Sequence, residues 1–107
     1  MSLVKKAGAL QKDVTTAATA VALSASKLIV TDAIIKAKAA NTNDIYVGGS
    51  DVDAASGYVL DATNTVRLRE LMGPAEPEAV FNLADVYIDA DTDGEGVSVL
   101  YFENSTL

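Results

Sequence analysis

Clusters of Asn, Asp, Gly and Ser interrupt this 107-residue chain at short intervals and leave little room for long helices. These residue types favour tight turns, and the clusters lie at 41–44, 48–51, 61–64 and 89–96. The segments between them have the composition or the period-two alternation of strands: 27–30, 33–38, 45–47, 58–60, 65–70, 79–83, 85–89 and 97–103. The sequence therefore predicts an all-β fold, a small jelly-roll-like β-sandwich of about eight short antiparallel strands.

One predicted strand has an irregular pattern. In residues 33–38, alanine and isoleucine alternate with lysine, but Ile34 places an apolar side chain on the side that carries the lysines. A helix is the alternative, because this segment is rich in alanine, whereas the Thr and Val content of residues 14–40 favours strands. Two prolines predict a loop over 71–78, since proline has no backbone donor for a strand ladder.

The first residues of the chain have neither a strand pattern nor a secure helix pattern. Gly8 would weaken a short helix by about 1 kcal/mol. The sequence therefore predicts an N-terminal extension over 1–13, a β-sandwich domain over 14–103 and a C-terminal tail over 104–107. Truncation of residues 1–13 is then expected to leave the sandwich folded.

Charge is distributed unevenly along the chain. Residues 1–40 contain six lysines and two aspartates, whereas residues 41–107 contain two arginines and thirteen acidic residues. The positive charge near the N-terminus is either a solvated end or part of a segment that orders on a partner through charge and apolar anchors. The second interpretation makes the extension mobile in the free protein and assigns partner binding to Leu3, Val4, Lys5, Lys6, Leu10 and Lys12.

The composition excludes several function classes. The chain has no Cys and no His, so it cannot form a disulfide, a thiolate nucleophile or a Ser-His-Asp apparatus, and no structural zinc site is expected. An enzyme is not expected, and neither is a cofactor. No apolar run is long enough to span a membrane, and the acidic body repels nucleic acid phosphates. We therefore expect neither a membrane nor a nucleic acid as partner.

The acidic turn at 89–96 matches the first half of a calcium-binding loop, because its aspartates alternate and a glycine follows them. The second half does not match, since Leu100 stands where such a loop needs a bidentate Glu. The sequence predicts a solvated hairpin turn without metal, and the alternative is a calcium site at Asp89, Asp91 and Asp93.

Several segments of the chain follow one another in a familiar order. The block 41–49, NTNDIYVGG, is followed by a loop rich in Ser, Asp, Ala and Gly, and then by the element GYVL at 57–60. The segments LADVYID at 83–89 and VSVLY at 97–101 complete the pattern. This order of strands and turns resembles that of small tailed-bacteriophage virion proteins, and the resemblance covers roughly residues 14–103. The basic extension and the loop at 71–78 depart from it.

This resemblance implies a structural role in the virion. The expected function is that of a capsid decoration, or cement, protein that binds the outer shell and stabilises contacts between capsomers. The implied partners are the major capsid protein and copies of the chain itself, and the alanine-rich core favours a homotrimer. The implied location is the capsid surface of a virion assembled in the host cytoplasm. The alternative is a head-fibre, neck or tail component with a receptor- or glycan-binding role, although the chain has no heptad pattern.

Overall fold

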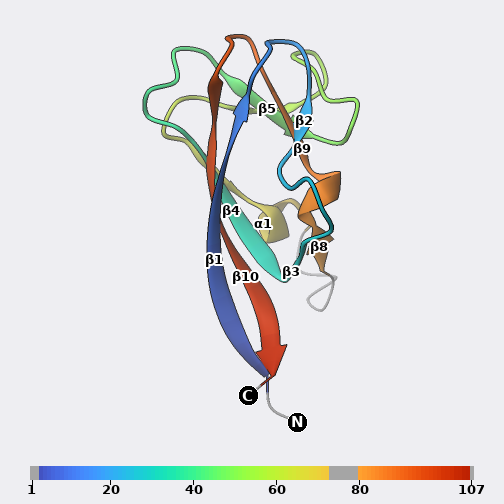
Figure 1. The fold of residues 1–107 in the computed structure, drawn as a ribbon. Helices are drawn as coiled ribbons and strands as arrows, with labels where there is room; N and C mark the ends of the chain where they lie inside the picture. The colour runs from blue at the N-terminus through green and yellow to red at the C-terminus, as the bar shows by residue number, and fades with distance from the viewer. Residues whose placement is uncertain (1–2, 73–79, 107) are drawn as a thin grey trace.

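The computed structural model describes residues 3–72 and 80–106 and contains two four-stranded antiparallel sheets (Figure 1). The sheet that we call the long sheet has the order β1 (Leu3–Val14), β10 (Glu95–Thr106), β4 (Asp32–Ala37) and β7 (Thr65–Arg67). The short sheet has the order β2 (Val21–Ala22), β9 (Tyr87–Ala90), β5 (Ile45–Gly48) and β6 (Tyr58–Leu60). A separate two-stranded ribbon pairs β3 (Ile29–Val30) with β8 (Phe81–Asn82).

The strand order of the two sheets is that of a jelly roll. With β3 and β8 set aside and the other strands renumbered along the chain, the long sheet has the order 1-8-3-6 and the short sheet 2-7-4-5. All connections between consecutive strands except β5–β6 therefore pass from one sheet to the other. This interleaving of two Greek keys defines the jelly roll. The prediction of a small jelly-roll-like β-sandwich is confirmed.

The core lies between the sheets and is filled by alternate side chains of their strands. Each fully buried Ile or Val contributes about 1.5–3 kcal/mol relative to an exposed one. The long sheet supplies Ala33, Ile35, Ala37, Val97 and Val99, and the short sheet supplies Ile45, Val47, Leu60, Ile88 and Ala90. Ile35 is fully buried and lies in register between Val99 and Val66.

Strand β1 shows that the expected boundaries at both chain ends are wrong. Residues 3–14 pair in continuous register with residues 95–106, so neither a separate extension over 1–13 nor a separate tail over 104–107 is present among the described residues. Figure 1 shows β1 and β10 projecting from the body as a twisted ribbon, with both termini at its tip. Pairing with a distant strand overrides the weak local propensity of this segment.

Gly8 explains part of this pairing. It lies opposite Tyr101 in β10, and the Tyr101 ring occupies the space that a side chain at position 8 would fill. An aromatic residue that covers a strand glycine restores the packing that the glycine lacks. Gly8, which in the sequence weakened the case for regular structure, is therefore part of the contact between β1 and β10.

The segment after β7 differs from the expected strand over 65–70. Strand β7 ends at Arg67, and a short helix, α1 (Leu68–Met72), begins there. Val66 and Leu68 are both buried, as the alternation predicted, but the sequence LRELM consists of good helix formers. The first two residues of the predicted loop 71–78 belong to α1, and its remainder lies outside the described residues.

A short helical turn separates two of the predicted strands, 79–83 and 85–89. The expected strand over 79–83 is reduced to β8 among the described residues, and a 3-10 helix, η1 (Leu83–Asp85), follows it. The Asn82 side chain caps this helix by accepting a hydrogen bond from the Ala84 N–H at 3.1 Å. Local side-chain bonding of this kind competes with strand pairing.

Candidate functional site

The outward side of the long sheet is an apolar surface with a positively charged rim. Successive side chains of a strand point to opposite faces. Because Ile35 faces the core, Ile34 faces outward, and pairing aligns it with Leu100 on one side and Arg67 on the other. Leu100 is in turn aligned with Ala9. We call this surface the cationic face and define it by Lys5, Ala9, Ile34, Lys36, Arg67, Leu100 and Phe102.

The cationic face is hollowed on both sides of Ile34. One cavity of about 300 Å³ is lined by Lys5, Thr31, Asp32, Ile34, Arg67, Arg69 and Phe102. A second cavity of about 310 Å³ is lined by Ala9, Ile34, Lys36, Thr65, Ser98, Val99 and Leu100. Leu100 is 42% exposed although it stands at the centre of a sheet. An exposed apolar surface with a polar rim is typical of an interaction site.

Hydrogen bonds fix the positive charge at the edge of this face. The Arg67 Nε–H donates to Asp32 Oδ2 at 2.6 Å, and the Arg69 Nε–H donates to the Thr31 carbonyl at 2.9 Å. Asp32 is nearly buried, and its Oδ1 accepts from the Ala33 N–H at 2.8 Å. Lys5 Nζ donates to Asn104 Oδ1 at 3.0 Å. The guanidinium of Arg67 is therefore oriented before any partner binds, which lowers the entropic cost of binding.

The partner-binding residues predicted from the sequence do not form one surface. Lys5 belongs to the cationic face, but Lys6, Leu10 and Lys12 alternate with it and lie on the other side of β1. Leu10 is half-buried and packs against the core. Val4 is exposed, and the side chain of Leu3 lies outside the described part of the structure. The set is divided because β1 is a strand, whose two faces have different surroundings.

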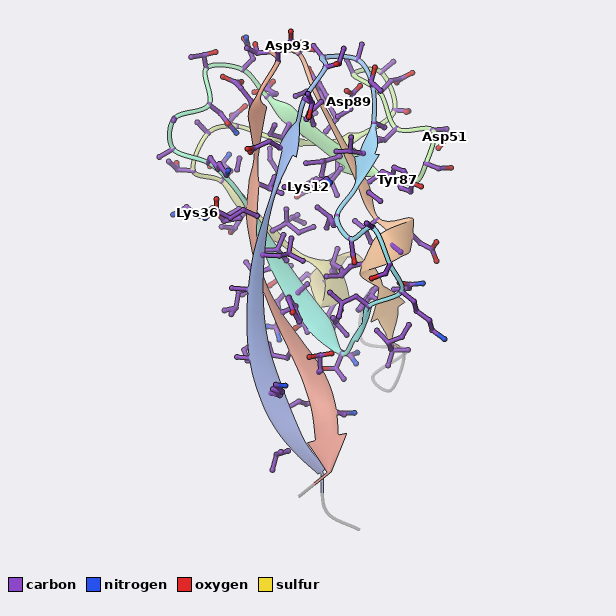
Figure 2. All side chains as sticks on the ribbon, viewed as in Figure 1. Lys12, Lys36, Asp51, Tyr87, Asp89 and Asp93 are labelled. Atoms are coloured by element: carbon purple, nitrogen blue, oxygen red, sulfur yellow. The ribbon has the colours of Figure 1, made fainter. Side chains whose placement is uncertain are left out.

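The acidic turn does not bring its three aspartates together. Asp93 Oδ1 accepts from the Ala17 N–H at 2.7 Å, and Asp91 Oδ2 accepts from the Tyr46 hydroxyl at 2.6 Å. Asp89 is buried within β9, where its Oδ1 accepts from the Ala90 N–H. Figure 2 shows Asp93 at the tip of the turn and Asp89 in the body below it. Within residues 3–72 and 80–106, no group of three acidic side chains is placed to hold a metal ion.

Two of these contacts have a structural function. The hydrogen bond to Asp91 raises the pKa of Tyr46 to about 12, so the hydroxyl remains a donor at neutral pH. Tyr46 is buried in β5, and its bond ties the middle of the short sheet to the β9–β10 turn. The Asp93 bond ties the same turn to the β1–β2 connection. Asp91 and Asp93 therefore connect the β9–β10 turn to β5 and to the β1–β2 connection.

The NTN sequence at 41–43 is also an anchor. The Asn41 side chain bonds both the N–H and the carbonyl of Gly96, at 3.2 and 2.9 Å. The Glu95 carboxylate accepts from the Thr42 N–H at 2.6 Å, the Thr42 hydroxyl at 2.8 Å and the Asn43 N–H at 3.0 Å. These bonds fasten the β4–β5 loop to the start of β10. Part of the block that carries the resemblance therefore has a folding role.

We expect Glu95→Gln to reduce the acid sensitivity of the protein. The backbone N–H of Thr42 is the main cause that lowers the pKa of Glu95 below its ordinary value of 4.5. The unfolded chain then binds the proton more tightly, so this stabilisation is complete above the ordinary pKa and is lost as pH falls through the lowered one. Melting temperatures of both proteins between about pH 7 and pH 3 measure the effect.

Comparing Glu95→Gln with the wild type separates the effect of Glu95 on acid stability from that of a carboxyl group whose pKa is raised. A hydrogen bond with Asp61 raises the pKa of Asp44. At Asp44, lowering the pH therefore stabilises the folded protein. The variant is expected to be less stable than the wild type at neutral pH and to lose less stability on acidification. Two parallel curves would contradict this assignment.

Sequence reasoning missed most of the cationic face. Two signals were present: the positive charge of Lys5, and Ile34, whose apolar side chain broke the alternation of residues 33–38. Its neighbours Leu100 and Arg67 lie far away in the sequence, and only strand register brings them together. The four tyrosines all lie in strands, Tyr101 in the long sheet and the other three in the short sheet. They do not form a shared binding face.

Comparison of the chain with protein-family models, curated proteins and solved structures gives no match in any of the three. In the described part of the chain, no helix has the length and apolar character needed to cross a membrane.

Proposed function

We propose that this chain is a structural protein of a tailed-bacteriophage virion, a capsid decoration protein that binds the outer shell and stabilises contacts between capsomers. Its partners are the major capsid protein and further copies of the chain, arranged as a homotrimer. The resemblance of residues 14–103 to small virion proteins is the starting point. The jelly roll supports the proposal, because it is a common fold of viral capsid proteins, although lectins also use it.

The observation that carries the proposal is the projecting β1–β10 ribbon. The molecule measures 46 × 25 × 23 Å, and the ribbon forms one end of its long axis (Figure 1). Val4 is 39% exposed near the tip, and Lys6 is exposed beside it. A two-stranded projection with exposed apolar and positive side chains is suited to insertion between subunits of a shell. This ribbon takes the docking role that the sequence assigned to a mobile arm.

The proposal is tested by adding the purified chain to shells that lack it and measuring binding by co-sedimentation. We expect saturable binding at many equivalent sites. Lys6→Glu should bind roughly fivefold more weakly, because reversing an exposed charge in an interface costs about 1 kcal/mol. The matched control is Lys27→Glu, which changes an exposed lysine in the β2–β3 connection. Melting curves check that the Lys6 variant folds, because it places two carboxylates opposite each other at positions 6 and 103.

Absence of binding to shells would overturn the proposal. Binding at only a few sites per particle would instead favour the neck, tail or fibre role. Equal binding of the Lys6 and Lys27 variants would exclude the ribbon as the docking element.

A further inference from the structure

A second exposed surface lies on the edge of the short sheet and has the opposite charge. Strand β6 is an edge strand, and its Tyr58 and Val59 are 49% and 48% exposed. Asp51 and Asp53 lie exposed in the loop before it, and Asp61 lies exposed directly after it. The chain has no Lys or Arg from residue 39 to residue 66. We call this surface the acidic edge and define it by Asp51, Asp53, Tyr58, Val59 and Asp61.

The acidic edge is preorganised in the same way as the cationic face. Asp53 Oδ1 accepts from the N–H groups of Ala55 and Ser56 at 2.9 and 3.0 Å, which fixes the β5–β6 loop. A side chain at Gly57 would collide with Tyr46 and Val52, so this loop packs closely on the sheet. Both surfaces therefore present exposed apolar side chains beside charges that the fold holds in place, and they differ in the sign of the charge.

We infer that copies of this chain associate head to tail, with the cationic face of one copy bound to the acidic edge of the next. Each surface would repel another copy of itself, because Lys5 and Lys36 would face lysines in one contact and the aspartates of the acidic edge would face aspartates in the other. Figure 2 shows Lys36 and Asp51 on opposite sides of the sandwich. Two different, complementary surfaces on one chain form a heterologous contact, which closes into a ring when the rotation between copies permits it.

The head-to-tail contact is the one that would build the homotrimer, and in this respect the inference rests on the proposed function. A closed trimer uses each cationic face and each acidic edge once, leaving no apolar surface of either kind in water. The contact uses the outward side of the β1–β10 ribbon, and the opposite side, which carries Val4 and Lys6, remains available for the shell. The chain itself supplies an acidic and apolar surface that fits the cationic face, and we therefore assign a second copy as the occupant.

The test reverses charges on the two surfaces and measures self-association of the purified protein by sedimentation velocity, without capsids. The wild type is expected to associate with rising concentration and to dissociate at high salt. Lys36→Glu and Asp51→Lys should each raise the dissociation constant at least roughly tenfold, because like charges then face each other. An equimolar mixture of the two variants should form a heterodimer, since the acidic edge of the Lys36 variant and the cationic face of the Asp51 variant are unchanged. A closed ring of three copies should not return, because it would contain two copies of one variant in contact. Lys27→Glu is the control and should behave as the wild type.

Each alternative occupant gives a different result. A chain that stays monomeric at high concentration would overturn the inference. An isologous contact through the cationic face would leave the Asp51 variant unchanged, and the mixture would offer no rescue. If only the Lys36 variant lost shell binding while no protein self-associated, the cationic face would bind an acidic surface of the shell instead. Shell binding of monomeric protein would keep the proposed binding to the outer shell and would remove this inference together with the homotrimer.

Discussion

Deletion of residues 1–13 is expected to leave the chain unfolded. These residues supply nearly all of β1, which pairs with β10 along twelve positions. Without it, β10 loses its neighbour on one side, and the half-buried Leu10 is removed from the core. A domain of this size is stable by about 5–15 kcal/mol, and loss of a whole strand from a four-stranded sheet exceeds that reserve. Circular dichroism and thermal melting of the truncated chain measure the outcome.

A shorter deletion provides the control. Removal of residues 1–4 takes away only the outermost described pairs, Leu3 with Thr106 and Val4 with Ser105. This chain should therefore melt cooperatively and close to the wild type. A cooperative melt of the longer deletion near the wild-type temperature would show that β1 contributes little to stability and that the separate arm predicted from the sequence is the better description.

We also expect Ile35→Ala to cause a large loss in the free energy of unfolding. Ile35 is fully buried at the centre of the long sheet, between Val99 and Val66 in register. Truncation of such a side chain removes the transfer free energy of its methyl groups and leaves a cavity, at a cost of about 2–5 kcal/mol. Urea denaturation gives the change in free energy directly.

The neighbouring residue is a matched control for this substitution. Ile34→Ala removes the same atoms from the same strand, but Ile34 lies on the partly exposed outward side. Its cost should be about 1 kcal/mol or less, because little apolar surface returns to water. The two variants also separate folding from assembly, since Ile34 belongs to the cationic face. Equal destabilisation by both would contradict the orientation of β4 that defines this face.

The parts of the fold that depend on local chemistry were predictable from the sequence. Turn residues at 41–44 and 61–64 separate the strands as expected, and the turn expected over 89–96 is shorter, at 91–94, because β9 continues to Ala90 and β10 begins at Glu95. The alternation of Ala33, Ile35 and Ala37 identified side chains that are all buried. These features depend on backbone preferences and on the period of a strand, which neighbouring residues determine.

The parts that depend on pairing between distant strands were not predictable. Residues 3–13 have weak strand character, and only their register with residues 95–106 makes them a strand. The helix at Leu68–Met72 was missed because two buried residues two positions apart also fit a strand. Within the candidate site, Lys5 was identified from its charge, but Arg67 and Leu100 required knowledge of the sheet order.

The position of this chain in purified virions tests the proposed role most directly, and a cryo-electron microscopy reconstruction of the particle measures it. We expect jelly-roll density on the outer surface of the capsid, in groups of three copies, with the β1–β10 ribbon directed into the shell. Difference density between particles with and without the chain identifies it. Density confined to the neck, tail or fibres, or absence of the chain from the particle, would contradict the account.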